Sequence, residues 1–326
     1  MPERSGRVAV VGSYVQDHAW FCDLFPRDGE SRRAHRFNTG PGGKGFNQAV
    51  ACHRQGVATV FIGALGDDHL GAIARRFAAE EGLEAHWQSV DAPNAASSIL
   101  VDARGANRIV VSLGANERLD PAFVRERLAS ARDARIVLCQ LENGLDAIAA
   151  ALEAGTAAGA LRMLNPAPMH PRLDPALLAH VDVATPNETE FALLLQHCAV
   201  ADVDPDAIAP LDDATLHALA RRLPVPTVVV TLGAQGCFVS HGTDLRGDAA
   251  PFYRIAAEPV HAIDTTGAGD AFSGALAAAL VRFDGAPFAH SARHANRAAA
   301  LSTETVGTAP AMPSWHAIAA RFGGAY

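Results

Sequence analysis

The stretch Ile263-Asp264-Thr265-Thr266-Gly267-Ala268-Gly269-Asp270-Ala271-Phe272-Ser273-Gly274 is the most informative part of this chain. It is a glycine-rich turn that runs into a helical pattern of small residues over 271–281, with a carboxylate at the junction. Backbone N–H groups and the dipole at a helix start form a site for an anion such as a phosphate. Beside them, Asp270 can take a proton from a hydroxyl while the amides hold a phosphoryl group. The alternative is that Asp270 only caps the helix.

Composition limits the classes of protein to consider. The 326 residues suffice for one large α/β domain or two small ones, and 49% are hydrophobic, so a sizeable core is expected. The net charge of −8 gives no general attraction to nucleic acid or to an anionic membrane. No apolar stretch reaches the roughly 20 residues that span a bilayer. The five cysteines lack metal-type spacing, so we expect a cytoplasmic protein.

Apolar runs alternate with alanine-rich helical patterns along the chain. The expected strands are 8–12, 59–64, 136–141, 161–165, 181–185 and 227–232. The expected helices are 45–55, 71–81, 121–131, 145–158, 189–196 and 215–223, and 201–213 looks like a surface loop. This alternation predicts an α/β fold with a doubly wound, mostly parallel sheet flanked by helices. Ligands of such sheets bind beyond the carboxyl ends of the strands, where Asn165, Asn187 and Gly233 are expected.

Five shorter motifs accompany the turn. They are Gly42-Gly43-Lys44-Gly45-Phe46-Asn47-Gln48-Ala49, Gly66-Asp67-Asp68, Asn165-Pro166-Ala167-Pro168, Thr185-Pro186-Asn187-Glu188-Thr189-Glu190 and Thr231-Leu232-Gly233. The ordered set spans residues 8–307 and resembles the ribokinase-like carbohydrate and nucleoside kinases, often called the PfkB family. Within that family the chain looks most like a bacterial nucleoside kinase. The resemblance implies an ATP- and Mg²⁺-dependent transfer of phosphate to an alcohol group.

The resemblance also implies a small β-sheet lid. Residues 14–39 are polar and aromatic, and 96–101 with 108–112 flank a turn, which predicts a hairpin. We therefore expect a kinase core over 1–13, 40–95 and 112–326, and a lid over 14–39 and 96–111. Exposed strand edges can pair subunits, so a homodimer through the lid is expected.

Two other glycine-rich nucleotide motifs are disfavoured. Residues 40–45 formally fit the dinucleotide pattern GxGxxG, but the polar residues 32–38 before them are no buried strand. The P-loop pattern fails because Asn38 and Phe46 replace a required glycine and a required hydroxyl residue. Lys44, in contrast, is the only lysine in the chain, which favours a functional point charge over chance retention.

The resemblance assigns a sugar side to the site. Gly43 would let the backbone approach a sugar, and Asn47 would present its amide to the sugar hydroxyls. A carboxylate accepts two hydroxyl hydrogen bonds from a vicinal diol, and Asp17 is matched to that role. Glu142 matches a residue near the anomeric carbon. Without the resemblance, Asp17 could be a solvated loop residue and Glu142 a neighbour of a helix cap.

The resemblance assigns a nucleotide side as well. Asn187 and Glu190 share a face at a helix start, and Glu190 would hold Mg²⁺ largely through water. A purely capping role for the pair is the alternative. Thr231 and Gly233 would line the phosphates and ribose of ATP, and Asn296 would lie near the adenine.

A monovalent cation site is matched by Asp264 and the backbone carbonyls of Thr266 and residues 305–307. Ala311 stands where the family often has a serine, so potassium dependence stays open. For catalysis, Asp270 would be the base. The amides of Gly267, Ala268 and Gly269 would stabilise developing charge, with help from Lys44.

Two departures from ribose kinases favour a nucleoside acceptor. Val15 replaces an asparagine and Phe46 a small residue, which makes the expected pocket wall more apolar. Aromatic residues of the lid segment (Trp20, Phe21 and Phe37) could stack on a base, a contact of about 1–3 kcal/mol in nucleic-acid sites. We therefore expect a purine nucleoside 5′-kinase; Phe46 packing in the core and a ribokinase remain the alternatives. A non-catalytic regulator is disfavoured by the intact turn before Asp270.

Overall fold

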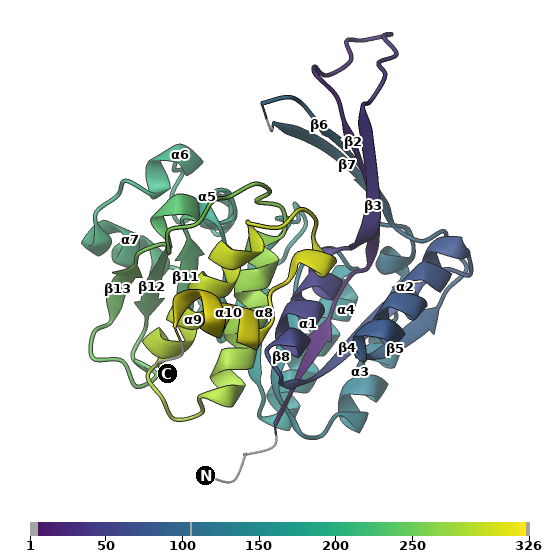
Figure 1. The fold of residues 1–326 in the computed structure, drawn as a ribbon. Helices are drawn as coiled ribbons and strands as arrows, with labels where there is room; N and C mark the ends of the chain where they lie inside the picture. The colour runs from purple at the N-terminus through teal and green to yellow at the C-terminus, as the bar shows by residue number, and fades with distance from the viewer. Residues whose placement is uncertain (1–5, 105, 324–326) are drawn as a thin grey trace.

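The computed structural model describes residues 6–104 and 106–323. Its body is a nine-stranded sheet between two layers of helices, and a four-stranded sheet projects from one edge (Figure 1). The helices are α1 (Lys44–Arg54), α2 (His69–Glu81), α3 (Pro121–Ser130), α4 (Leu145–Ala158), α5 (Glu188–His197), α6 (Pro205–Ile208), α7 (Asp213–Ala220), α8 (Ala268–Arg282), α9 (Phe288–Ser302) and α10 (Trp315–Phe322). None of the helices in the described ranges is long and apolar enough to cross a bilayer.

The large sheet has the order β13-β12-β11-β10-β9-β8-β1-β4-β5. Its parallel strands are β1 (Arg7–Val11), β4 (Ala58–Leu65), β5 (Glu84–Ser89), β8 (Ala134–Cys139), β9 (Leu161–Leu164), β10 (Val183–Ala184) and β11 (Thr227–Thr231). Two antiparallel strands, β12 (Cys237–His241) and β13 (Phe252–Ile255), complete one edge. The doubly wound, mostly parallel fold class is therefore confirmed.

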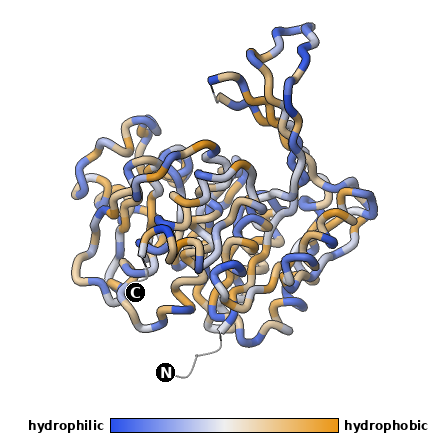
Figure 2. The backbone as a smooth tube through the Cα atoms, in the orientation of Figure 1, coloured by the Kyte–Doolittle hydropathy of each residue, from blue (hydrophilic) through white to orange (hydrophobic). Residues whose placement is uncertain are grey.

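Alternate residues of each strand enter different cores. Val8 and Val10 of β1 pack with α1, α2, α8 and α9, whereas Ala9 and Val11 pack with the helices of the opposite face, α3 to α7. Both faces are buried, which explains why the strands are continuous hydrophobic runs. Figure 2 shows these hydrophobic segments in the body. The expected loop at 201–213 is corrected, because α6 lies inside it and Ile208 is fully buried.

The small sheet has the order β3-β2-β6-β7, from β2 (Val15–Phe21), β3 (Arg36–Gly42), β6 (Ala96–Val101) and β7 (Asn107–Ser112). Its strands come from the two segments expected to form a lid, and β3 continues three residues past 39. The loop that joins β2 to β3 is strongly hydrophilic (Figure 2). A moving lid and the division into domains stay predictions.

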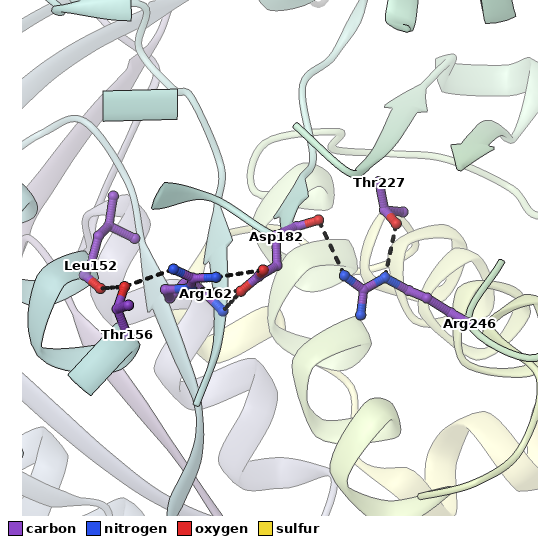
Figure 3. Close-up of polar contacts among 6 residues, drawn as sticks. All are labelled: Leu152, Thr156, Arg162, Asp182, Thr227 and Arg246. Atoms are coloured by element: carbon purple, nitrogen blue, oxygen red, sulfur yellow. Dashed lines mark hydrogen bonds and ion pairs between the residues drawn. The ribbon is translucent and has the colours of Figure 1, made fainter. Parts of the chain in front are cut away.

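The amino ends of the central strands carry a network of paired charges (Figure 3). The guanidinium of Arg162 binds both carboxylate oxygens of Asp182, at 2.7 and 2.6 Å, and donates to Thr156 Oγ1 at 2.7 Å. Arg246 donates to Thr227 Oγ1 at 2.8 Å and to the Asp182 carbonyl at 3.4 Å. These bonds join β9, β10 and β11 where the strands begin, so the network fixes the sheet at the edge opposite the carboxyl ends of its strands.

Candidate active site

The motif residues meet at the carboxyl edge of the large sheet. Asn165 follows β9, Thr185 follows β10, and helices α1 and α8 pack against each other beside them. Two hydrogen bonds from α1 reach the first turn of α8, and Gln140, which follows β8, donates to Gln48 of α1. Parallel strands therefore gather the polar side chains, as expected for a ligand site of an α/β sheet.

Asp270 is the third residue of α8, because the helix begins at Ala268 with Gly267 as its N-cap. Gly267 has a φ of 80°, a conformation that residues with a side chain rarely adopt. Asp270 makes no capping hydrogen bond, so the capping alternative is wrong. Asp270 is buried, with 5% of the residue exposed. Its Oδ2 accepts from Asn47 Nδ2 and its Oδ1 from Gln48 Nε2, both at 2.9 Å.

Asn47 has one polar atom without a partner. Its Oδ1 is buried and makes no hydrogen bond within the described parts of the chain. A buried acceptor without a donor costs about 1–3 kcal/mol, so such atoms call for an explanation. A hydroxyl of a bound sugar would supply the missing donor, and the sugar-binding role of Asn47 stays a prediction.

Asp17 lies in strand β2 rather than in a solvated loop, so that alternative is wrong. Its Oδ1 accepts from Ser97 Oγ at 2.6 Å and its Oδ2 from Thr308 Oγ1 at 3.1 Å. Burial raises the pKa of Asp17, and these two hydrogen bonds oppose that shift. A Cβ at Gly42 would lie 2.0 Å from Asp17 Oδ2, so only glycine leaves room for this carboxylate.

A cavity of about 590 Å³ opens beside Asp17, between the small sheet and the loops at 262–266 and 306–310. Phe21, Arg36 and Phe37 line it from the small sheet. The guanidinium carbon of Arg36 lies 3.6 Å from the centre of the Phe21 ring, so cation–π attraction holds the two groups together. The cavity thus runs from a carboxylate to an aromatic and cationic surface.

Val15 and Phe46 do not form the wall of this cavity, which corrects the expectation from the sequence. Phe46 is fully buried, with its ring 5.4 Å from both Tyr14 and Phe61 in edge-to-face contacts. Val15 is 2% exposed and is not among the lining residues. A large apolar side chain at a helix start can fill a core or a pocket, and here the core alternative for Phe46 is right.

Gly43 and Glu142 shape the start of α1. Gly43 caps the helix with a φ of 90°, and a Cβ there would lie 2.6 Å from the Val15 backbone nitrogen. Glu142 Oε2 accepts from Ser13 Oγ at 2.5 Å and from the Lys44 backbone nitrogen at 2.9 Å. These contacts, rather than the cap of α4 at Gly144, occupy Glu142. Burial raises the pKa of the Glu142 carboxyl, although Lys44 opposes this shift.

Lys44 lies in the field of several carboxylates. Burial on its own would lower the pKa of Lys44, but the charges of Asp270, Glu142, Glu190 and Asp17 outweigh it and raise that pKa. Lys44 is therefore a firmly charged ammonium group. Its position between the sugar-side and nucleotide-side carboxylates suits a role in holding phosphate oxygens.

Asn187 and Glu190 form a capping box at the start of α5, so the capping alternative describes their mutual contacts. Asn187 Oδ1 accepts from the Glu190 nitrogen at 2.8 Å, and Glu190 Oε2 accepts from the Asn187 nitrogen at 2.9 Å. Burial raises the pKa of Glu190. Asn187 pairs with Thr231 through an isolated bridge, which brings the two expected nucleotide residues together. Gly233 begins a short turn after β11 with a φ of 51°.

Residues 6–104 and 106–323 contain no group of three or more histidine, cysteine, aspartate or glutamate side chains arranged to hold a metal ion. Glu190 still offers its second oxygen, Oε1, because the hydrogen bond that its carboxylate accepts within the described residues is at Oε2. Mg²⁺ keeps several waters and is commonly bound by one or two carboxylates together with substrate phosphates. The residues present therefore fit a magnesium ion that arrives with a nucleotide.

Two expected site residues have structural partners. Asn296 donates to the Ala256 carbonyl at 2.9 Å, so its position beside an adenine stays a prediction. Asp264 accepts from the backbone nitrogens of Thr266 and Gly307, each at 3.0 Å, and thereby joins two loops. A monovalent cation at Asp264 and Thr266 likewise stays a prediction.

The sequence did not single out several residues that position the site. Ser97 and Thr308 bind Asp17, Ser13 binds Glu142, and Gln48 binds Asp270. Gln48 lies within a motif that the sequence analysis quoted, but the motif did not reveal its contact with Asp270. Ser13, Ser97 and Thr308 lie outside those motifs.

Known proteins resemble this chain over nearly its whole length. Residues 5–315 match the model of the pfkB family carbohydrate kinases. A ribokinase from Mus musculus is 33% identical over 313 residues, which cover 95% of this chain and 93% of the relative. The structure of a ribokinase from Giardia lamblia superposes with a TM-score of 0.85 at 27% identity, covering 98% of this chain and all of that one. A ribokinase from Arabidopsis thaliana, solved with ribose and ATP, gives 0.80 at 27% identity, covering 96% and 97%.

Nucleoside kinases share the fold at lower identity. A nucleoside kinase from Burkholderia thailandensis, solved in complex with inosine, has a TM-score of 0.76 over 98% of each chain, but only 20% of the residues are identical. That likeness supports the fold alone. The family match and the ribokinase relatives, taken with the geometry around Asp270, lead to one conclusion. The chain belongs to the pfkB family of carbohydrate kinases and is a phosphotransferase that acts on an alcohol group.

Proposed function

We propose that this kinase transfers the γ-phosphate of ATP to the primary hydroxyl of a furanose sugar, with free ribose as the first candidate. The observation that carries the proposal is the buried carboxylate of Asp270, held by two side-chain amides in the first turn of α8. Relatives that are 33% identical and named ribokinase support ribose. Ribose thus ranks above the nucleoside expected from Val15 and Phe46, because neither side chain faces the cavity.

The residues divide the work of the reaction between them. Sugar hydroxyls donate to Asp17 and to the unpartnered Oδ1 of Asn47. Asp270 accepts the proton of the primary hydroxyl as its oxygen bonds to the γ-phosphorus, and the bond from that phosphorus to the β–γ bridging oxygen breaks to release ADP. The amides of residues 267–269 and Lys44 stabilise the charge that develops. Mg²⁺ near Glu190 would neutralise charge on the phosphates.

A nucleoside is the second candidate, favoured by the extent of the cavity. The cavity continues from Asp17 to Phe21 and Arg36, and its volume of about 590 Å³ is larger than a free pentose needs. A base could stack on the Phe21–Arg36 surface, a contact of about 1–3 kcal/mol in nucleic-acid sites. The ribose ring and its 5′-hydroxyl would occupy the same places in both candidates.

One activity panel separates the candidates. ADP release would be measured with ATP, Mg²⁺ and, in turn, ribose, fructose, inosine, guanosine, adenosine and cytidine. We expect kcat/KM to be highest for ribose. A higher kcat/KM for any nucleoside would make a nucleoside the preferred acceptor in place of ribose. The absence of turnover with every acceptor would contradict the proposal as a whole. Repeating the assay with and without potassium tests the cation role of Asp264.

We also propose that the small sheet pairs two subunits. Its edge strand β7 exposes 52% of Ile109, 73% of Val110 and 42% of Val111. Exposed apolar edge strands readily pair with another chain. Sedimentation equilibrium of the wild type and of Val110→Lys tests the proposal, which predicts a dimer for the first and a monomer for the second.

A further inference from the structure

The carboxylate of Asp270 is held by two neighbours of different character. Asn47 is 3% exposed, and its Oδ1 has no hydrogen-bond partner within the described residues. Gln48 is the next residue of α1, but it is fully buried and offers no surface to a ligand. Gln48 therefore contacts the reacting group without being able to contact the sugar.

All the hydrogen-bonding capacity of the Gln48 amide nitrogen is used. Nε2 donates to Asp270 Oδ1 at 2.9 Å and to Asn165 Oδ1 at 3.0 Å. The Oε1 atom accepts from Gln140 Nε2 at 2.6 Å. Rotating this amide by 180° would turn its oxygen towards two other acceptors and its nitrogen towards a donor. The network thus allows a single orientation of Gln48.

The neighbours of Gln48 are fixed in turn by the edge of the sheet. Gln140 follows β8 directly and is fully buried. Asn165 follows β9, is 5% exposed, and donates to the carbonyl of Thr185, which follows β10. The direction of the Asp270 carboxylate is therefore set, through Gln48, by residues at the carboxyl ends of three adjacent strands.

A general base must lie within hydrogen-bond distance of the proton that it removes, and a displacement of about 1 Å can cost about 10²-fold in rate. We propose that Gln48 is a positioning residue for phosphoryl transfer, which aims the carboxylate of Asp270 at the acceptor hydroxyl without touching either substrate. The proposal rests on Asp270 as the base of the proposed function.

The first test is Gln48→Met, which keeps the length of the side chain and removes both donors. We expect kcat to fall about 10- to 100-fold, while KM for ribose and for ATP stays within about twofold. The matched control is Gln55→Met at the C-cap of the same helix. Gln55 is 1% exposed and donates to the carbonyl of Pro313, away from the site. We expect this control to lower stability and leave kcat within about twofold.

The second test asks whether Gln48 acts through Asp270. In an Asp270→Asn background, Gln48→Met should lower kcat by less than about twofold, because the group that it aims is already lost. A full 10- to 100-fold loss in that background would overturn the inference, as would an unchanged kcat in the single variant. Near-normal turnover of Asp270→Asn itself would instead contradict the proposed function.

A third variant serves if Gln48→Met does not fold. Gln140→Met removes the donor to Gln48 Oε1 and leaves the bond from Gln48 to Asp270 in place. Its own Oε1 has no hydrogen-bond partner within the described residues, so little else is lost. We expect a smaller fall in kcat, about 3- to 10-fold, again with KM unchanged. An unchanged kcat here would overturn the idea that the sheet edge sets the aim of the base.

Discussion

Two polar networks lie at opposite edges of the same sheet and differ in the groups that bind their carboxylates. At the amino edge, Arg162 meets Asp182 through two charged hydrogen bonds, with 19% and 18% of their side chains exposed (Figure 3). At the carboxyl edge, Asp270 is buried but has no salt bridge among the described residues, and its hydrogen bonds come from the neutral amides of Asn47 and Gln48.

The two edges also differ in what is left unsatisfied. The arginine network satisfies both carboxylate oxygens of Asp182 internally. At the carboxyl edge, buried oxygen atoms on Asn47, Gln140 and Asn143 have no hydrogen-bond partner among the residues that the structure describes. Because buried polar groups normally find partners, paired charges indicate a structural role, and a charge surrounded by unsatisfied atoms indicates a site prepared for a ligand.

The largest expected effect comes from Asp270→Asn. The amide cannot accept the proton of the acceptor hydroxyl, so we expect kcat to fall about 10²–10⁴-fold. Binding of ribose and ATP should persist, as isothermal titration would show. Turnover close to that of the wild type would contradict the role of Asp270 as the general base at the carboxyl edge.

Arg162→Met tests the amino edge. It leaves the Asp182 carboxylate without its guanidinium, and since both side chains are less than a third exposed we expect a loss of about 2 kcal/mol in the free energy of unfolding. Urea denaturation measures this loss. At temperatures where the variant is folded, kcat should match the wild type; a reduced kcat there would show that the two edges are coupled.

Asn47→Ala removes the unpartnered acceptor together with one donor to Asp270. Loss of a neutral hydrogen bond is worth about 0.5–1.5 kcal/mol, so KM for ribose should rise about 3- to 10-fold, accompanied by a lower kcat. Steady-state kinetics against ribose at saturating ATP measures both quantities. An unchanged KM would mean that the orphan oxygen does not receive a sugar hydroxyl.

Glu142→Gln should have the smallest effect, visible in the pH dependence of stability. Burial raises the pKa of Glu142 in the folded state, so its stabilising contribution is complete below the unfolded pKa and is lost as pH rises through the folded pKa. The variant carries no such group. Its urea midpoint relative to wild type should therefore increase from about pH 4 upwards and then level off. A difference that is constant or falls with pH would contradict the shift.

The sequence predicted the central elements of the fold because their signals are strong. Buried strands such as 59–64 are continuous apolar runs, and the structure places β4 there. Strand β5 was missed because its residues are only partly buried and alternate weakly. Helix α9 was missed because its buried residues after Phe288 are alanine, serine, histidine and asparagine rather than large apolar residues.

Sequence motifs singled out Asp270 and Asn47, and the structure joins their side chains by a hydrogen bond. Contacts that join distant segments were not predictable from the sequence. Thr308 reaches Asp17 across 291 residues of sequence, and Ser97 reaches it across 80. The error at Phe46 has a similar cause, since hydrophobicity alone does not tell which side of a helix meets a cavity.

The single lysine has a practical consequence for chemistry in solution. Acylating reagents attack the neutral amine, so the ammonium group of Lys44, whose pKa is raised by its surroundings, should react slowly near neutrality. Because the chain has no other lysine, mass spectrometry of the acylated peptide measures the acylation rate of Lys44 alone. Bound nucleotide should lower this acylation rate, and replacing a nearby carboxylate with a neutral amide should raise it.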